Sequence, residues 1–190
     1  MLKKAVVFAS GNGSNFQAIV DAAKNKEINV SVELLVCNNE EAYVVKRATA
    51  SGVDTLLVDY HQYSYFEIES MLLKMFKEMK IDYIFLAGFL RKLSPYFVMN
   101  YQNKILNIHP SFLPKYKGMN AVEQAIANRE AQIGVTVHYV DEKLDHGPMI
   151  VQEGINTKGL TNDEIYEEVH KLEHRLYIEA IIQVMEDQNE

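Results

Sequence analysis

Cysteine is almost missing from this sequence, and long apolar runs are missing altogether. The single cysteine, Cys37, can form neither an internal disulfide bond nor a cysteine-based zinc site. It follows the apolar residues 34–36, so a buried side chain is a better interpretation than a nucleophile. No apolar run reaches transmembrane length, and the residues before the first Gly-rich turn are too few for a signal peptide. We therefore expect a cytoplasmic protein without a membrane partner.

Positive charge and proline are also scarce. The chain has 19 Lys and Arg residues against 26 Asp and Glu residues, a formal charge of −7. This balance argues against nucleic acid as a partner, although a local basic pocket stays possible. The four prolines all lie at residue 95 or later, in loops that the patterns below suggest for a site: Pro95, Pro110, Pro114 and Pro148.

The sequence does contain enough apolar residues for a substantial core. Hydrophobic residues make up 48% and charged residues 24% of the 190, which is ordinary for a globular protein. A chain of this size predicts a single domain over residues 1–190, acting as a monomer or a homodimer.

Short apolar runs alternate with amphipathic stretches along the chain. The predicted strands are residues 5–9, 30–37, 53–58, 83–87, 105–109, 132–140 and 149–155. A final helix is expected over 161–187, where Thr161 and Glu164 can form a capping box. A helix over 65–79 is expected to bury the stripe Phe66, Met71, Leu72, Met75, Phe76 and Met79. The alternation predicts an α/β, Rossmann-like fold, an open twisted and mostly parallel sheet of about seven strands with helices on both faces.

A Gly-rich turn follows the first predicted strand and precedes a helix. Its sequence is Ser10-Gly11-Asn12-Gly13-Ser14-Asn15. Such a turn can bind an anion, because backbone N–H groups and the helix dipole point at the ligand and glycine lets it approach. Ser14 and Asn15 could cap the helix or contact the anion themselves. A tight turn without a ligand is the alternative.

The turn lacks the features of the common nucleotide-binding loops. It does not end in Gly-Lys-Ser/Thr, and Phe16 stands where a dinucleotide loop has its third glycine. The next predicted strand ends in Asn38 and Asn39, not in an acidic residue that would hold a ribose, although Glu40 is near. These absences favour a single phosphate or a phosphoribosyl group over NAD.

Asn107 and His109 end the fifth predicted strand. They are two residues apart, so their side chains share a face of the strand, and Pro110 stops the strand because it has no N–H to donate. Ligands of open α/β sheets bind at such carboxyl ends. A structural strand end is the plain alternative. Asp145, in a later turn, is the best candidate to orient His109, although spacing alone cannot bring them together.

The other histidines give a weaker signal. His138 lies in an alternating stretch, where it more simply fills a sheet position than a site. A metal site built from His109, His138 and His146 would lack a ligand spacing such as His-Glu-x-x-His, so we expect no metal.

Four motifs occur in order along the chain. They are the turn at 10–15, Leu86-Ala87-Gly88-Phe89-Leu90-Arg91, Asn107-Ile108-His109-Pro110-Ser111-Phe112-Leu113-Pro114-Lys115-Tyr116 and Leu144-Asp145-His146-Gly147-Pro148. Together they resemble the folate-dependent formyltransferase family over essentially the whole chain. The Gly-Asn-Gly-Ser-Asn turn resembles its phosphoribosylglycinamide formyltransferase (glycinamide ribonucleotide transformylase) branch.

The resemblance implies transfer of the formyl group of the co-substrate 10-formyltetrahydrofolate to the primary amine of glycinamide ribonucleotide in de novo purine biosynthesis. Asn107 and a protonated His109 would stabilise the tetrahedral oxyanion, and His109 would relay or donate the proton. Asp145 would fix the His109 ring and favour its charged form.

The resemblance also implies the binding residues. Gly13, Ser14 and Asn15 would hold the ribonucleotide phosphate, and Lys171 and Glu173 would contact the same substrate. The expected folate contacts are Leu90, Arg91, Lys92, Leu93, Asn107, Asp141, Glu142, Lys143, Leu144 and Asp145.

Three positions depart from the pattern. Tyr65 stands where related sequences often carry a basic folate contact, Asn120 replaces a histidine, and His146 follows Asp145 where glycine is frequent.

Two kinds of rival function remain. A deformylase or a methionyl-tRNA formyltransferase-like enzyme shares the Asn-His-Asp core but carries a further domain, for which we expect this chain to have no room. A non-catalytic phosphosugar-binding module would use the turn but gives no reason for Asn107, His109 and Asp145.

Overall fold

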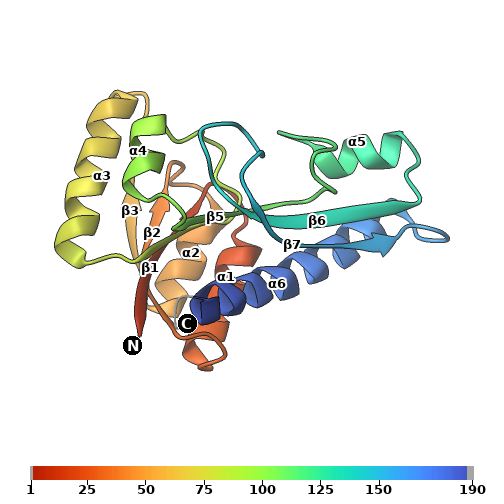
Figure 1. Ribbon diagram of the computed structural model, residues 1–190, viewed down its shortest axis with the longest axis horizontal. Coiled ribbons are helices and arrows are strands. Elements are labelled where there is room, and N and C mark those ends of the chain that lie inside the picture. Colours follow the sequence, from red (N-terminus) through yellow and green to blue (C-terminus); the bar gives the residue numbers. More distant parts are fainter. Residues whose placement is uncertain (1, 188–190) are drawn as a thin grey trace. The chain divides into compact units, whose positions relative to one another are not determined.

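The computed structural model describes residues 2–187, which form an α/β fold (Figure 1). The strands are β1 (Lys3–Ala9), β2 (Val30–Cys37), β3 (Asp54–Leu57), β4 (Tyr83–Leu86), β5 (Ile105–His109), β6 (Gln132–Tyr139) and β7 (Met149–Asn156). The helices are α1 (Ser14–Lys24), α2 (Tyr43–Ser51), α3 (Tyr65–Met79), α4 (Pro95–Asn100), α5 (Ala121–Ala127) and α6 (Asn162–Asp187). The strands make a seven-stranded sheet in the order β3-β2-β1-β4-β5-β6-β7. The predicted open, mostly parallel sheet is confirmed.

The chain divides into two compact units, Met1–Leu106 and Asn107–Glu190. The single domain over 1–190 stays a prediction.

The first unit is a parallel sheet with helices on both sides. β1 pairs with β2 and β4, and β2 pairs with β3, all in parallel. In Figure 1, α3 and α4 lie on one side of β1–β3, and α1 and α2 lie on the other. β1 is buried from Ala5 to Ala9, and the Phe8 ring packs edge-on against the rings of Phe76 and Phe97. Its covered, continuously apolar strand is typical of a parallel sheet.

Helix α3 has the predicted bounds but only part of the predicted buried face. Leu72 and Phe76 are buried as expected, and Met75 and Met79 are only half-buried. Phe66 is 70% and Met71 42% exposed, so the expectation for these two is wrong. Their places on the buried face are taken by Ile68 and Glu69. The Glu69 carboxylate accepts hydrogen bonds from the backbone N–H and the hydroxyl of Ser94, the N-cap residue of α4. The buried acid therefore joins α3 to the start of α4.

The second unit contains an antiparallel strand pair, β6 with β7, on which α6 packs. The predicted capping box of α6 is confirmed, since Glu164 Oε2 accepts from Thr161 N at 2.7 Å and Thr161 Oγ1 accepts from Glu164 N at 3.3 Å. The apolar residues on one face of α6 are buried, namely Ile165, Val169, Leu172, Leu176 and Ile181. A register shift between Val137 and His138 precedes the turn that joins the two strands.

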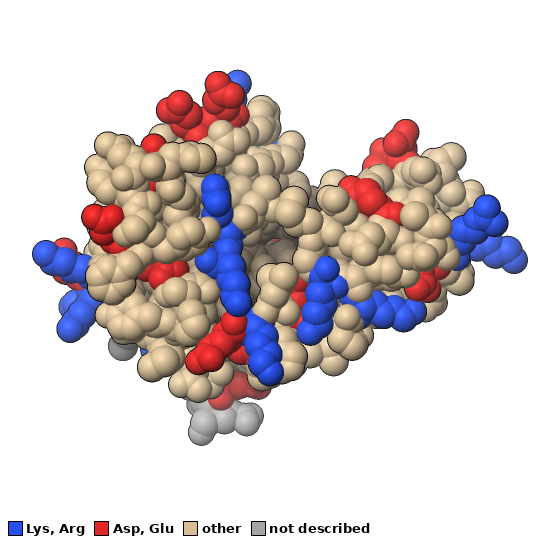
Figure 2. All heavy atoms as spheres, turned by 90° about the horizontal axis from the view of Figure 1, so that it is seen from above, with Lys and Arg blue, Asp and Glu red and all other residues tan. Residues whose placement is uncertain are grey.

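Charges of both signs are spread over the surface. In Figure 2, Lys and Arg side chains and Asp and Glu side chains are interspersed on a face that is mostly uncharged. The net charge of −7 therefore does not form one continuous acidic area on this face. No helix among the described residues is both long and apolar enough to cross a membrane.

Candidate active site

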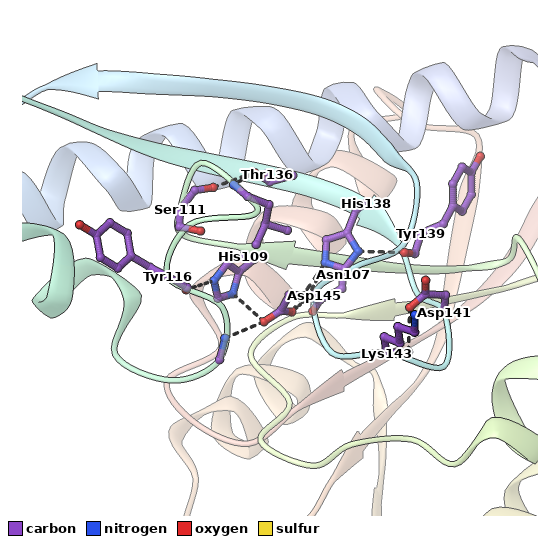
Figure 3. Close-up of polar contacts among 12 residues, drawn as sticks. Asn107, His109, Ser111, Tyr116, Thr136, His138, Tyr139, Asp141, Lys143 and Asp145 are labelled. Carbon is purple, nitrogen blue, oxygen red and sulfur yellow. Dashed lines mark hydrogen bonds and ion pairs between the residues drawn. The ribbon is translucent and has the colours of Figure 1, made fainter. Parts of the chain in front are cut away.

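The C-terminal end of β5 brings Asn107 and His109 to Asp145 (Figure 3). His109 Nδ1 lies 3.6 Å from Asp145 Oδ2, and Asn107 Nδ2 lies 3.4 Å from Asp145 Oδ1. His109 and Asp145 are only 6% and 8% exposed. The structure therefore assembles the three side chains that the sequence singled out, although they are up to 38 residues apart.

The second ring nitrogen of His109 has a partner that the sequence did not suggest. His109 Nε2 lies 2.7 Å from the backbone oxygen of Tyr116. A carbonyl oxygen can only accept, so this nitrogen carries a hydrogen. The Gly118 N–H donates to Asp145 Oδ2 at 2.8 Å. Both His109 nitrogens thus face oxygen atoms, Nε2 a hydrogen-bond acceptor and Nδ1 a carboxylate at ion-pair distance.

His138 also reaches this cluster. It lies in β6, as expected, but its Nε2 is 3.1 Å from the Asn107 amide nitrogen and 3.8 Å from Asp145 Oδ1. Nδ1 is 2.8 Å from the Tyr139 carbonyl oxygen. Because the Asn107 NH₂ donates, Nε2 accepts, and the hydrogen is on Nδ1. Burial lowers the pKa of His138, opposed by the Tyr139 carbonyl and the Asp145 charge. A neutral His138 therefore helps orient the Asn107 amide.

The turn between β6 and β7 holds Asp145 in a strained conformation. Asp145 has φ 45°, a value that side-chain-bearing residues seldom adopt. Asp141 accepts from Lys143 N at 2.8 Å and contacts His146 Nδ1 at 2.8 Å. Burial raises the pKa of Asp141, but these contacts outweigh it and lower the pKa overall. At Gly147 a Cβ would lie 1.8 Å from the Tyr139 oxygen, so only glycine fits there.

A polar network fixes the segment that follows β5. Thr136 Oγ1 donates to the Ser111 carbonyl at 2.7 Å and accepts from Leu113 N at 3.3 Å. Gln152 Nε2 donates to Thr136 Oγ1 at 2.7 Å. The segment that carries the Tyr116 carbonyl is therefore attached to both β6 and β7.

In the first unit, the Gly-rich turn leads into α1, and Gly13 is its N-cap residue. No side chain caps this helix, so of the two roles considered for Ser14 and Asn15, capping is not the one adopted. The N–H groups of a first helical turn have no carbonyl partner within the helix. The Asn15 Oδ1 atom is buried and has no hydrogen-bond partner among the described residues. The turn thus offers free donors and an unsatisfied amide to a ligand.

The two glycines of the turn serve different purposes. Gly13 has φ 78°, and a Cβ there would lie 2.4 Å from Val44 Cγ2, so the close packing of α1 on α2 requires glycine. At Gly11 a Cβ would meet no atom within 4 Å. Only Gly11 therefore leaves open space that a ligand can use.

Ser10 connects the ends of three strands, a role that the sequence did not reveal. Its N–H donates to the Gly88 carbonyl at 3.0 Å, and its hydroxyl donates to Asn38 Oδ1 at 2.5 Å and accepts from Leu90 N at 2.9 Å. This links the ends of β1, β2 and β4. The turn at 10–15 and the start of the 90–93 loop are thereby held together.

The side chains predicted to contact the folate differ in how exposed they are. In the 90–93 loop Leu90 is exposed and Leu93 buried, Lys92 is exposed, and the Arg91 guanidinium lies 5.3 Å from the centre of the Tyr60 ring. Burial, with Glu69 and Tyr65 nearby, raises the pKa of Tyr60 to about 12. In the 141–145 turn Glu142, Lys143 and Leu144 are exposed.

On α6, Lys171 is exposed and pairs with Glu168 at 2.6 Å, whereas Glu173 is buried. Two of the positions that depart from the family pattern have defined places: the centre of the Tyr65 ring lies 4.7 Å from that of the Tyr60 ring at an interplanar angle of 45°, and Asn120 is the N-cap residue of α5 with φ 59°. Within residues 2–187 no group of three or more His, Cys, Asp or Glu side chains is arranged to hold a metal ion.

Comparisons with known proteins agree on one family. Residues 3–181 match the formyl transferase family. The phosphoribosylglycinamide formyltransferase of Bacillus subtilis is 39% identical over 97% of this chain and 95% of its own length, and that of Escherichia coli is 38% identical over 90% and 82%. The chain also matches 18% of the human trifunctional purine biosynthetic protein adenosine-3, at 35% identity.

Solved structures give the same result. The glycinamide ribonucleotide transformylase 1 of Geobacillus kaustophilus superposes with a TM-score of 0.90 at 40% identity, covering 97% of this chain and 99% of that one. The phosphoribosylglycinamide formyltransferase of Bacillus halodurans superposes with a TM-score of 0.91 at 35% identity, covering 99% and 97%. The resemblance inferred from the four motifs is confirmed, and the chain belongs to the formyl transferase family.

Proposed function

We propose that this enzyme transfers the formyl group of 10-formyltetrahydrofolate to the primary amine of glycinamide ribonucleotide, in de novo purine biosynthesis. The observation that carries the proposal is the His109 ring, held between the Asp145 carboxylate and the Tyr116 carbonyl beside the Asn107 amide. The names of the full-length relatives support the same substrate. The protein would act in the cytoplasm on small molecules alone, as a monomer or a homodimer, without nucleic acid or membrane.

The chemistry requires a charge to be stabilised and a proton to be moved. The amine nitrogen attacks the formyl carbon, and the carbonyl oxygen becomes an oxyanion. A C–N bond to the amine forms, and the C–N bond to the folate nitrogen breaks. The Asn107 NH₂ and a protonated His109 donate to the oxyanion, typically the largest catalytic contribution. The proton lost by the amine reaches the folate nitrogen, with His109 as relay.

The Gly-rich turn is proposed to bind the ribonucleotide phosphate through Gly13, Ser14 and Asn15. The free N–H groups of the first turn of α1 suit an anion, and the unpaired Asn15 amide oxygen suits a ribose hydroxyl. Lys171 and Glu173 of α6 are proposed to contact the same substrate.

The folate co-substrate is proposed to contact two loops and the end of β5. The residues are Leu90, Arg91, Lys92, Leu93, Asn107, Asp141, Glu142, Lys143, Leu144 and Asp145. The pterin ring presents donors and acceptors, which the exposed backbone of the 141–145 turn can match. Because Tyr65 is uncharged, affinity is expected to depend little on the length of the polyglutamate tail at that position.

A single assay distinguishes the candidate functions. The purified chain is incubated with 10-formyltetrahydrofolate alone, with added glycinamide ribonucleotide, or with added methionyl-tRNA, and tetrahydrofolate release is followed. We expect release only with glycinamide ribonucleotide, together with the formylated ribonucleotide in equal amount. Release without an acceptor would show a deformylase, and no release in any arm would leave a binding module.

A further inference from the structure

Tyr116 connects His109 to a second carboxylate, Glu130, which lies outside the Asn107–His109–Asp145 cluster. Its backbone oxygen faces His109, and its side chain faces Glu130. We propose that Tyr116 and Glu130 are positioning residues, because the Glu130 carboxylate anchors the Tyr116 side chain and so holds the Tyr116 carbonyl at His109 Nε2. This inference rests on the proposed function, in which His109 acts on the formyl group.

The backbone of Tyr116 needs an anchor. Its φ of 52° lies in the left-handed region, which is unfavourable for a residue with a Cβ. Figure 3 shows the ring pointing away from His109 while the backbone faces it. The ring hydroxyl donates to Glu130 Oε1 at 2.8 Å. The contact at the far end of the side chain thus helps hold the carbonyl in an otherwise strained position.

Glu130 is itself fixed on both sides. Its backbone N–H donates to the Ala125 carbonyl of α5 at 3.1 Å, and its carbonyl accepts from Thr157 Oγ1 at 2.7 Å, directly after β7. The carboxylate therefore projects from a segment attached to a helix and to the end of a strand. A rigid support of this kind is what a positioning residue requires.

The charges around Glu130 support an ionised acceptor. The Lys115 ammonium lies 3.0 Å from the same Oε1 atom. Hydrogen bonds from Tyr116 and Lys115 lower the pKa of Glu130, and the bond to Glu130 raises the pKa of the Tyr116 hydroxyl. Near neutral pH the hydroxyl keeps its proton and the carboxylate keeps its charge, so the contact is a charge-assisted hydrogen bond.

The Tyr116 carbonyl holds the His109 ring in one orientation. With Nε2–H bound to this oxygen, Nδ1 faces Asp145. If the anchor is lost, Tyr116 can leave φ 52° and its carbonyl can withdraw. His109 is then free to turn, and its charged ring is no longer held beside the Asn107 amide, where the oxyanion forms. Such a defect lowers turnover without weakening the binding of either substrate.

Tyr116→Phe tests the anchor most cleanly, because it removes only the hydroxyl and leaves the carbonyl. Lys115→Met is the matched control, since it removes the other partner of the same Glu130 oxygen. We expect Tyr116→Phe and Glu130→Ala each to lower kcat about tenfold with both KM values within about twofold, since small misplacements have effects of this order. Glu130→Gln should restore most of the loss because its amide oxygen accepts from the hydroxyl, and Lys115→Met should remain near wild type.

The 15N chemical shifts of the His109 ring give a readout that does not depend on activity. We expect the shift of a protonated Nε2 in the wild type and in Lys115→Met. In Tyr116→Phe and Glu130→Ala we expect the 15N shifts of the His109 ring to differ from those of the wild type. Unchanged shifts and an unchanged kcat in both of these variants would overturn the inference, as would equal loss in Lys115→Met. A wild type with the expected shifts but no formyl transfer would refute the proposed function while leaving the positioning of the ring intact.

Discussion

The His138 ring has one nitrogen toward the Asn107 amide and the other toward a backbone carbonyl, an arrangement that suits a neutral imidazole. Protonation would place an N–H against the Asn107 NH₂, so burial and geometry act together. Because the neutral His138 Nε2 can only accept, the Asn107 amide must turn its NH₂ group toward this nitrogen. We therefore infer that His138 supports the proposed reacting groups and does not react itself.

His138 predicts a pH dependence of stability. Burial lowers its pKa in the folded state, so below the ordinary histidine pKa, about 6.5, the unfolded chain binds a proton that the folded chain does not. Folded-state stability is therefore lost as the pH falls through this range. We expect the unfolding free energy of the wild type to fall more steeply than that of His138→Gln between about pH 7 and pH 5. Urea unfolding at several pH values measures this, and parallel curves for the two proteins would contradict it.

Residue types in the sequence predicted the three side chains of the proposed site but not all of the groups that contact them. Asn107 and His109 follow from a polar pair at a strand end, and Asp145 from its motif. Tyr116 and Gly118 contribute backbone groups. Every residue has such groups, so the residue types could not predict these two contacts. His138 was assigned to the sheet, which is correct, but the sequence could not show that its ring contacts Asn107.

The Gly-rich turn has to allow the close packing of α1 on α2 and, in the proposed function, also bind the substrate phosphate. Gly13 satisfies the packing of α1 on α2, because a Cβ would collide with Val44 and the φ of 78° disfavours any other residue. A change at Gly13 would thus disturb folding and binding together. The open space at Gly11 provides a cleaner probe of the ligand.

Alanine substitutions at the two glycines should therefore affect different properties, substrate binding at Gly11 and stability at Gly13. Gly11→Ala should keep the wild-type unfolding temperature and raise the KM for glycinamide ribonucleotide at least about tenfold, because the methyl group blocks a close approach to the backbone. Its KM for the folate should not change. Gly13→Ala should lower stability by about 1–3 kcal/mol, through strain and a clash. Thermal unfolding and steady-state kinetics measure both effects, and a wild-type KM in Gly11→Ala would argue against phosphate binding at this turn.

Helix α3 marks the limit of prediction from periodicity. The spacing of apolar residues located the helix correctly, yet it counted Phe66 and Met71 as core and missed Glu69. A buried glutamate is favourable only because Ser94 donates two hydrogen bonds to it, and Ser94 is 25 residues further along the chain. Local pattern cannot contain such a distant partner.

For the whole molecule, the alternation of strands and helices was sufficient to predict the sheet and its mainly parallel order. The four motifs were sufficient for the family, which the comparisons confirm over residues 3–181. The conformation of the turn that carries Asp145 was not predictable, because it depends on a φ of 45° at Asp145 and on the close contact of Gly147 with Tyr139. Long-range contacts of this kind determine where a catalytic group points, while the sequence determines which group it is.

The central claim is that Asn107, His109 and Asp145 act as one unit in formyl transfer. Loss of one oxyanion donor typically costs about 10²–10³ in kcat, and Asn107→Ala should fall near that range with its fold intact. Asp145→Asn keeps the shape of the side chain but removes the carboxylate charge that faces Nδ1.

The most direct test is a cycle of kcat values, with glycinamide ribonucleotide and 10-formyltetrahydrofolate, for Asp145→Asn, His109→Ala and the double variant across pH. Because the residues act together, the double variant should lose little more activity than His109→Ala alone. Asp145→Asn by itself should lose at least about tenfold. If instead Asp145→Asn keeps kcat within about twofold at every pH, Asp145 only shapes its turn, and the account of the site is contradicted.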